Sequence, residues 1–567
     1  MKFYQQTIKL IMFKRIIFLT FTLFISACGN VPITSGINEG PELGIDGKDS
    51  IIRVIASRPQ PGMSQEQIVN GFLNASASSD NDFAIARDYL VPDKKDNWNP
   101  STSIEVYEGQ AQIQVVKEGE VSFTAALNST IDEESRINIS EPDEQLQKKF
   151  TLIRVNDEWR IDLDFDGLII SKTDLNRSFS IYPIWFVDPT SSYLVPENVI
   201  LPKSVSANAT RLMQLLLNGP SKNFNSSVVT GFPEGSALGI DSVPISNGVA
   251  TVTLNEAVLK AENKNREILS AQIVKTLTRI PGVSSIQIKV GTQNLNVPNT
   301  SLIQNASTWE KYYSDAFREN NPYLISNQKV YQLVDDKFVD IPRSEINSLN
   351  WSFGTSNRQE NLYALVNPEK TQLNVFDYRN NSLKKYAYQI GLFKNPVIDV
   401  FDYIWFISDG QIQVQKDGKI LNVDLAKFDE VNVIEVIPAP DGVRILLIVR
   451  TVYGTELRIG NVIRKDQVIT ITNIRKVIRD GFSVSEASWA DEANILYIDK
   501  AQEITSIFSL DSFTAISNKL YEISGAIDVS ASSKQRVLIE KNDGTILERV
   551  AGDWKLIPNS SSINFPN

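Results

Sequence analysis

Short, strongly apolar segments recur at a nearly even spacing through the C-terminal half of the chain. They begin at Leu362, Ile404, Ile445, Ile495 and Val537, so the intervals between successive starts are 42, 41, 50 and 42 residues. Polar turns that contain glycine, serine or aspartate lie before and after several of them, as is typical of β-strands. A period of about 40 to 50 residues built from strands and turns predicts a β-propeller, because each blade needs four strands.

We expect this propeller to occupy residues 306–567, a stretch of 262 residues. At about 43 residues per blade that length allows about six blades, and the segment Tyr323–Ile341 would complete the remaining blade. A β-sandwich is the alternative, but a sandwich does not require an even period. Four tryptophans fall at comparable places in the repeat and are predicted to pack between neighbouring blades rather than to bind a ligand: Trp351, Trp405, Trp489 and Trp554.

Residues 51–190 are predicted to form a small α+β domain. Ser64 is a suitable helix N-cap and Gln67 completes a capping box, so a helix is expected to begin here. A second short helix is expected from Phe83 to Leu90, ending at Pro92. Alternating apolar residues between 104 and 165 then predict strands of a curved antiparallel sheet, the arrangement of nuclear-transport-factor-like and cystatin-like domains.

Residues 191–305 show the order helix, hairpin, helix, strand. The first helix is predicted at Ala209–Leu217, where Gly219 and Pro220 stop it, and the second at Arg266–Ile280. Asn247 and Gly248 between them predict a tight hairpin, because both residues accept the positive φ angles of a type I′ turn. This order fits a two-layer α/β sandwich.

The N-terminus has the features of a bacterial lipoprotein signal. Basic residues without any acid precede an apolar run at Ile16–Ile25, which is too short to span a membrane as a helix. The sequence Ile25-Ser26-Ala27-Cys28 resembles a lipobox, and Cys28 is the only cysteine of the chain. We therefore predict that residues 1–27 are a signal peptide, with Met1 and Met12 both open as the start, and that Cys28 carries fatty acids such as palmitate.

Residues 28–50 are predicted to be a flexible tether, because glycine and proline interrupt any periodicity there. Acyl chains on Cys28 would hold the protein at the extracytoplasmic face of the cell membrane, since each buried methylene contributes about 0.8 kcal/mol. The 67 acidic and 56 basic residues give a net charge of −11. Such an acidic chain is not expected to bind nucleic acid.

The composition excludes many kinds of catalytic and metal-binding site. The chain has no histidine and one cysteine, which excludes histidine-based triads, zinc sites with histidine ligands, haem ligation and internal disulfides. The run Asp162-Leu-Asp164-Phe-Asp166-Gly167 starts like an EF-hand loop, but Thr173 stands where the bidentate acid is required. We expect no catalytic residue, metal site or cofactor, although a pair of carboxylates without histidine would suffice for a glycosidase.

Several motifs along the chain resemble those of one family, the actinobacterial LpqB lipoproteins. In the first domain these motifs are the run from Pro61 to Ala75 and the pair Trp159-Arg160 followed by Asp166-Gly167. The second domain is similar to the GerMN domain of sporulation and germination proteins, through Leu217-Asn-Gly-Pro220, Phe232-Pro-Glu-Gly235, Asn247-Gly-Val249 and Ala271–Thr278. The turn Pro440-Asp441-Gly442 resembles those of TolB-like propellers, although alanine precedes it where serine is usual.

The resemblance implies a function as an accessory lipoprotein and not as an enzyme. LpqB-like proteins are tied to the MtrAB two-component system, which acts in cell-envelope homeostasis and division. By this resemblance the partner would be the extracellular domain of the sensor histidine kinase MtrB, whose signalling the lipoprotein modulates. The alternative is a cell-wall glycan-binding protein or a carboxylate-based envelope hydrolase.

Overall fold

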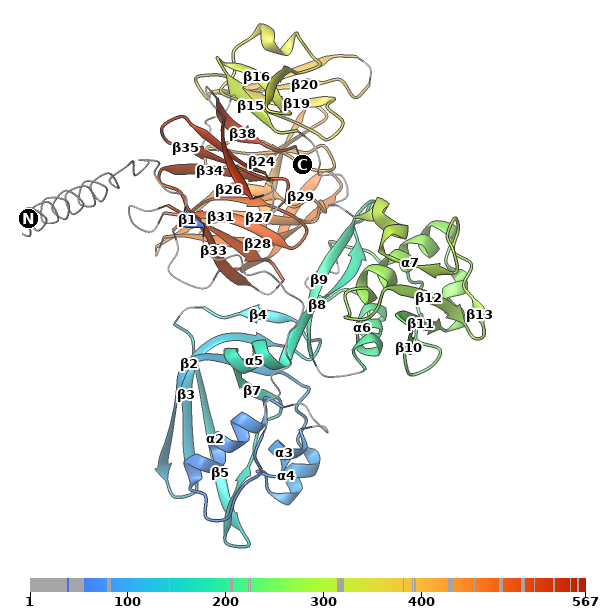
Figure 1. Cartoon of the computed structure of the whole chain (residues 1–567), viewed down its shortest axis with the longest axis vertical. Coiled ribbons are helices and arrows are strands. Elements are labelled where there is room, and N and C mark those ends of the chain that lie inside the picture. The colour runs from blue at the N-terminus through green and yellow to red at the C-terminus, as the bar shows by residue number, and fades with distance from the viewer. Residues whose placement is uncertain are drawn as a thin grey trace, which may run out of the picture.

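The computed structural model describes three folded modules (Figure 1). It covers residues 38–39 and 56–566, except 79–82, 142, 204–206, 223, 225, 314–320, 381, 390, 392–393, 427–431, 453, 479–482, 501–504, 514, 534–535, 551 and 558–559. Cys28, the signal peptide and almost all of the predicted tether lie outside these residues. The described part of the tether, β1 (Asn38–Glu39), pairs antiparallel with strand β33 (Ile516–Glu522).

The first module packs helices against a curved sheet of six strands, as predicted. The sheet has the order β6-β5-β3-β2-β7, with β4 paired to β3. Helix α2 (Gln65–Ala75) begins at the predicted N-cap Ser64, and the capping box with Gln67 is present. The strands are β2 (Ile104–Lys117), β3 (Glu120–Ile131), β4 (Ile137–Ile139), β5 (Gln145–Val155), β6 (Glu158–Asp162) and β7 (Leu168–Ser171). The sheet is not antiparallel throughout, contrary to the prediction, because β7 pairs in parallel with β2.

One helix boundary in this module differs from the prediction. Helix α3 (Ala84–Arg87) is only one turn long, and Pro92 begins α4 (Pro92–Asn97) instead of marking the end of a helix. Proline fits the first helical position because the N–H that it lacks would have no partner there. A further short helix, α5 (Lys172–Ser178), follows the sheet.

A long hairpin joins the first module to the second. Its strands are β8 (Phe179–Val187) and β9 (Leu194–Pro202), and the predicted boundary at residue 190 falls in its turn. Phe179 and Ile200 pack in the core of the first module, whereas Trp185 and Val195 pack in the core of the second. The hairpin therefore belongs to both cores and leaves no free linker between these two modules.

The second module is the predicted α/β sandwich. Strand β11 (Val249–Leu254) pairs in parallel with β12 (Ser285–Val290), and helix α7 (Asn263–Leu277) connects them. Asn247 and Gly248 have φ angles of 51° and 78°, which confirms the predicted hairpin turn. The remaining elements are α6 (Asn208–Leu217), β10 (Ile245–Ser246), η1 (Glu256–Lys260), β13 (Gln293–Asn294), β14 (Ile303–Gln304) and η2 (Ala306–Tyr312).

The described residues of the third module form six four-stranded blades. Blades 2 and 3 are β18 (Phe353–Ser356), β19 (Leu362–Val366), β20 (Gln372–Asp377), β21 (Lys384–Gln389), and β22 (Val397–Ile398), β23 (Ile404–Ser408), β24 (Gln411–Lys416), β25 (Lys419–Leu425). Blades 4 and 5 are β26 (Asn432–Pro438), β27 (Arg444–Thr451), β28 (Gly454–Lys465), β29 (Val468–Lys476), and β30 (Val484–Trp489), β31 (Asn494–Asp499), β32 (Ser506–Asp511), β33. Blade 6 is β34 (Ala526–Ala531), β35 (Arg536–Lys541), β36 (Ile546–Val550) and β37 (Asp553–Ile557).

Blade 1 closes the ring with strands from both ends of the module. It combines β15 (Tyr323–Ser326), β16 (Lys329–Val334) and β17 (Lys337–Asp340) with the C-terminal strand β38 (Ser561–Asn564) in the innermost place. The turn η4 (Ile346–Ser348) leads into blade 2. The innermost strands contact one another in a complete circle, in the order β38, β18, β22, β26, β30, β34 and back to β38.

The five repeated apolar segments are the second strands of blades 2 to 6, namely β19, β23, β27, β31 and β35. The one interval of 50 residues has a structural cause, because β28 and β29 of blade 4 are 12 and 9 residues long. Strand β29 also pairs with β25, which joins blades 3 and 4 into one sheet. The even period therefore corresponds to one blade, and the longer interval of 50 residues corresponds to the enlarged blade 4.

The tryptophans pack between blades, as predicted, but do not occupy comparable places. Trp351, Trp405 and Trp489 are at most 1% exposed. Trp351 precedes β18 and Trp489 ends β30, whereas Trp405 is on β23 and Trp554 is on the outermost strand β37. Each lies in a cluster that combines residues of neighbouring blades, such as Trp489 with Leu446 and Tyr497. No helix among the described residues is both long and apolar enough to cross a membrane.

Candidate functional site

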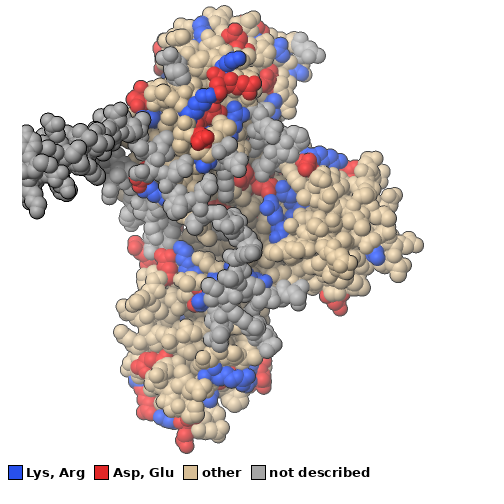
Figure 2. All heavy atoms as spheres, viewed as in Figure 1, with Lys and Arg blue, Asp and Glu red and all other residues tan. Residues whose placement is uncertain are grey.

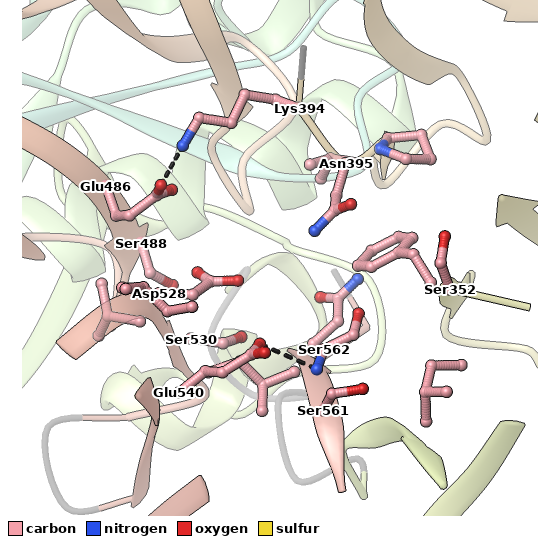
Figure 3. Close-up of a pocket in the computed structure, with 18 of the residues that line it drawn as sticks. Ser352, Lys394, Asn395, Glu486, Ser488, Asp528, Ser530, Glu540, Ser561 and Ser562 are labelled. Carbon is pink, nitrogen blue, oxygen red and sulfur yellow. Dashed lines mark hydrogen bonds and ion pairs between the residues drawn. The ribbon is translucent and has the colours of Figure 1, made fainter. Parts of the chain in front are cut away.

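The central channel of the propeller opens into a cavity of about 760 Å³. We call it the acidic cavity, because three of the six blades supply a carboxylate to its wall. Each blade contributes at least one polar side chain from its innermost strand or from the residues just before that strand, and Figure 3 labels members from five of the six blades. In blade order these residues are Ser562, Ser352, Lys394, Glu435, Glu486 and Asp528.

A repeated backbone irregularity positions the three acids. The ladder between the first and second strands shifts register directly before Glu435 in blade 4, before Glu486 in blade 5 and before Asp528 in blade 6. A β-bulge re-aims the side chain that follows it. The same bulge at the same place in three successive blades therefore turns three carboxylates to the same cavity.

Two carboxylates of the acidic cavity, Glu435 and Glu486, share Lys394. The Nζ atom of Lys394 forms an ion pair with Glu486 and lies 3.6 Å from Oε2 of Glu435. Burial would lower the pKa of Lys394, but Glu435 and Glu486 together raise it above its ordinary value. One lysine beside two carboxylates leaves the group with an excess of negative charge.

Burial raises the pKa of these acids. Burial and then the charge of Glu486 hold the pKa of Glu435 well above its ordinary value, and the same two causes act on Asp528. Burial also raises the pKa of Glu540, although its Oε2 accepts a hydrogen bond of 2.9 Å from the backbone N–H of Ser562. Protonated carboxyls in the wall donate hydrogen bonds, whereas ionised ones accept them. The cavity is thus suited to a polar ligand with hydroxyl or amino groups.

The other end of the channel is covered by the second module. Lys275 and Arg279 of the α7 region both form ion pairs with Glu492, in the turn between β30 and β31. The Nζ atom of Lys275 lies 2.7 Å from Oε2 of Glu492 and 3.6 Å from the ring centre of Tyr313, and both members of this pair are 9% exposed. Figure 2 shows lysine and arginine side chains gathered where the second module faces the propeller.

The acids in the turns at this covered end have structural roles. Oδ1 of Asp441 accepts hydrogen bonds from the backbone N–H groups of Val443 and Arg444, both at 2.9 Å. Asp491 and Asp399 bind the backbone of their own turns in the same way. These carboxylates bind the backbone of the blade turns, whereas Glu435, Glu486 and Asp528 on the innermost strands and Glu540 on β35 line the open cavity.

The sequence motifs led to the turn acids and missed the acids of the cavity. A signal was present, because Glu435 stands six residues before Asp441 and Glu486 stands five residues before Asp491. The EF-hand-like run is also structural where the structure resolves its contacts, since Oδ1 of Asp166 accepts a hydrogen bond from the N–H of Asn99. Cys28 lies outside the described residues, so its lipidation stays a prediction.

Comparison with known proteins assigns all three modules. Residues 58–176 match the family described as Lipoprotein LpqB, N-terminal domain, and residues 347–566 match the Lipoprotein LpqB beta-propeller domain. Residues 183–296 match the family described as Sporulation and spore germination. These modules define a lipoprotein in which a germination-type domain sits between an α+β domain and a propeller. The chain belongs to the LpqB lipoprotein family, and the name lipoprotein implies a membrane-anchored protein.

Individual relatives are distant but extend over the whole chain. The chain is 22% identical to Lipoprotein LpqB of Streptomyces coelicolor over 95% of this chain and 97% of that protein. It is also 22% identical to Lipoprotein LpqB of Thermobifida fusca over 84% of this chain and 85% of the relative. Among solved structures, the tandem GerMN domains of GerM from Bacillus subtilis are 24% identical over 26% of this chain and 49% of theirs, with a TM-score of 0.20.

Proposed function

We propose that this protein is a lipid-anchored, extracytoplasmic accessory protein that binds the extracellular domain of an MtrB-like sensor histidine kinase and modulates its signalling. The family that the chain belongs to is named for lipoproteins and not for an enzyme activity. The lipobox-like sequence at Cys28 would place the three modules at the outer face of the cell membrane. A sensor domain of a membrane kinase is exposed at that same face.

The observation that carries this proposal is the fixed junction between the second module and the propeller. Val443 of the propeller packs in the hydrophobic core of the second module, beside the buried pair of Lys275 and Glu492. The hairpin β8–β9 packs in the cores of both the first and the second module. Domains held in this way present one preformed surface, and preorganisation lowers the entropy cost of binding a partner.

Co-purification from membranes tests the proposal. The full-length chain and its Cys28→Ser variant are expressed in an actinobacterium, and proteins captured from detergent-solubilised membranes are identified. The wild type is expected to recover a sensor kinase, and Cys28→Ser is expected to leave the membrane fraction and recover much less. Ser35→Ala, seven residues further along the tether, is the matched control and should behave as the wild type. Membrane retention of Cys28→Ser, or recovery of no kinase by the wild type, contradicts the proposal.

A second pair of variants tells which module contacts the kinase. Leu302 and Ile303 of the second module are 58% and 51% exposed, and Val550 and Leu556 of blade 6 are 49% and 55% exposed. Aspartate at both positions of one pair introduces charge without disturbing a core. We expect the change in the second module to weaken kinase capture and the change in blade 6 to leave it unaltered. The reverse result would place the contact on the propeller.

The acidic cavity supports a second candidate function, a cell-wall glycan-binding protein or a carboxylate-based envelope hydrolase. A glycosidase needs two carboxyl groups, one of them an acid with a raised pKa; burial raises the pKa of Glu435, which lies beside Glu486, the ion-pair partner of Lys394. Pull-down on purified cell wall, with an assay for released muropeptides, tests this candidate. Binding or release that is lost in Glu486→Gln supports it, and the absence of both in the wild type removes it.

A further inference from the structure

A second cavity, of about 70 Å³, lies where all three modules meet. We call it the arginine cavity. The first module contributes β4 and Arg136, and the hairpin and second module contribute Glu197, Asn198 and Ser221. The propeller contributes Arg444, Arg475, Asn473 and Ser512. Its wall thus carries three guanidinium groups and one carboxylate, the opposite charge balance to the acidic cavity.

Two of the three arginines are already held by ion pairs. Nε of Arg136 donates to Oε1 of Glu197 at 2.7 Å, and Nε of Arg444 donates to Oδ2 of Asp441 at 2.6 Å. The second oxygen of Glu197 accepts a hydrogen bond of 3.1 Å from the backbone N–H of Ser221. Among the described residues of the wall, Glu197 is the one carboxylate, and each of its oxygens already accepts a hydrogen bond.

Arg475, on β29, is the third arginine and has no such partner. Among the described residues no side chain or backbone group forms an ion pair or hydrogen bond with its guanidinium. Burial, and then the charge of Arg444, lowers the pKa of Arg475 to about 10, against the opposing effect of Glu197. Arg475 is only partly exposed and forms no ion pair with any described residue, and an incompletely solvated cation of this kind is poised to bind an anion.

Two further polar groups in the wall are unused. Ser221 is 5% exposed, and its hydroxyl has no hydrogen-bond partner among the described residues. Oδ1 of Asn198 is likewise buried without a partner among the described residues, while its Nδ2 donates a long hydrogen bond of 3.4 Å to the carbonyl oxygen of Ser512. A hydroxyl and a guanidinium that face the same small space are donors without an acceptor.

We propose that the arginine cavity binds one small oxyanion, of the phosphate or sulfate class. A guanidinium presents paired N–H groups that match two oxygens of such an anion, and the Ser221 hydroxyl supplies a further donor. A cavity of about 70 Å³ accommodates a few water molecules or one small oxyanion, but not a sugar or a peptide. The anion would be either a free ion or the terminal phosphoryl group of a larger molecule.

An anion bound in the arginine cavity would affect how the three modules are held together. Its wall is complete only when the first module, the second module and the propeller are docked together. A ligand that binds only the docked arrangement stabilises that arrangement. The anion would therefore strengthen the junction on which a preformed binding surface depends.

Isothermal titration of the full-length chain in detergent, with inorganic phosphate at constant ionic strength, tests the proposal. We expect one saturable site per chain in the wild type. In Arg475→Met the affinity is expected to fall at least about tenfold, the usual effect of losing a charge-assisted hydrogen bond, and in Ser221→Ala about fivefold. Arg450→Met, which removes an exposed arginine of β27, is the matched control and should bind as the wild type.

Two further measurements make the result decisive. Thermal unfolding without phosphate checks that Arg475→Met folds, and its melting temperature is expected to equal or exceed that of the wild type because a partly desolvated cation without an ion-pair partner among the described residues is removed. Glycerol phosphate in a parallel titration separates the two sources of the ligand: equal binding indicates a terminal phosphoryl group, and weaker binding a free ion. No saturable binding of phosphate or sulfate at millimolar concentration, or undiminished binding in a folded Arg475→Met, overturns the proposal.

Discussion

The two ends of the propeller channel use charged residues in opposite ways. At the covered end, Asp441 and Glu492 are each tied to a turn or to a basic residue of the docked module. At the open end, Glu435 and Glu486 share Lys394, and together with Asp528 they face a cavity of about 760 Å³. Acids of the same propeller therefore either stabilise the fold through hydrogen bonds and ion pairs or remain available to a ligand. The position relative to the blade turn decides which.

The largest effect is expected at the covered end, from Lys275→Ala. The substitution removes the buried ion-pair partner of Glu492, and breaking a buried ion pair costs about 3 kcal/mol. Urea unfolding of the propeller, followed by tryptophan fluorescence, measures the loss. Lys541→Ala, which breaks an ion pair with the half-exposed Asp543, is the control and should cost less than about 1 kcal/mol. Equal midpoints for both variants would show that the buried pair does not hold the junction.

The next largest loss of stability is expected when an acid of a blade turn is replaced, and not when an acid of the acidic cavity is replaced. Asp441→Ala removes two hydrogen bonds to backbone N–H groups and the partner of Arg444, and is expected to cost about 2–3 kcal/mol of unfolding free energy. Asp528→Asn, on the innermost strand of blade 6, should cost nothing at neutral pH. The same denaturation assay compares them. A loss of similar size in both variants would remove the distinction between the two kinds of acid.

A smaller effect is expected from the aromatic ring that covers Lys275. The Nζ atom lies 3.6 Å from the ring centre of Tyr313, so Tyr313→Leu removes a desolvated cation–π contact of about 2 kcal/mol. Tyr313→Phe keeps the ring and removes a hydroxyl that has no hydrogen-bond partner among the described residues. Thermal unfolding should therefore place Tyr313→Phe at or above the wild type and Tyr313→Leu below it. The opposite order would mean that the hydroxyl, and not the ring, stabilises the junction.

The smallest effect is a gain, expected from Glu435→Gln at the open end. Because burial and Glu486 raise the pKa of Glu435 in the folded protein, its contribution to stability is present below the unfolded pKa and is lost as pH rises through the folded pKa. Replacing it should stabilise the protein by about 1 kcal/mol at pH 8 and flatten the dependence of melting temperature on pH above about pH 5.

The exposed Asp543 is the control for the direction of this pH dependence of stability. Hydrogen bonds from Thr545 and Lys541 lower the pKa of Asp543 to about 2, so its contribution is present above the unfolded pKa and lost as pH falls through the folded one. Asp543→Asn should therefore change the melting temperature in the opposite direction, and only slightly. A melting temperature of Glu435→Gln that follows the wild type at every pH would contradict the raised pKa.

Much of the fold could be predicted from local sequence. The capping box at Ser64, the turn at Asn247-Gly248 and the even spacing of buried second strands each reflect a short-range rule, and the structure confirms all three. Helix α3 lies within the predicted helix Phe83–Leu90 but is shorter, and the helix that begins at Pro92 was not predicted, because proline is compatible with both the end and the start of a helix. The short strands β4 and β7 were missed because they hold too few residues to show a period.

The residues of the two candidate sites could not be predicted from such short-range rules. Glu435, Glu486 and Asp528 are 51 and 42 residues apart and meet only because the blades close into a ring. Arg136 and Arg475 are separated by more than 300 residues and line one cavity because three modules dock at a single point. No short-range pattern marks a residue whose partner lies in another module.

By itself the sequence determined the three modules, their order, the period of the blades and the membership in the LpqB family. These depend on local periodicity, turn chemistry and motifs, which any segment carries within itself. Only the tertiary structure decided which charged residues lose their water and which keep a partner. Burial and pairing depend on what the remainder of the chain places beside a residue, and that is set when the ring closes and the modules dock.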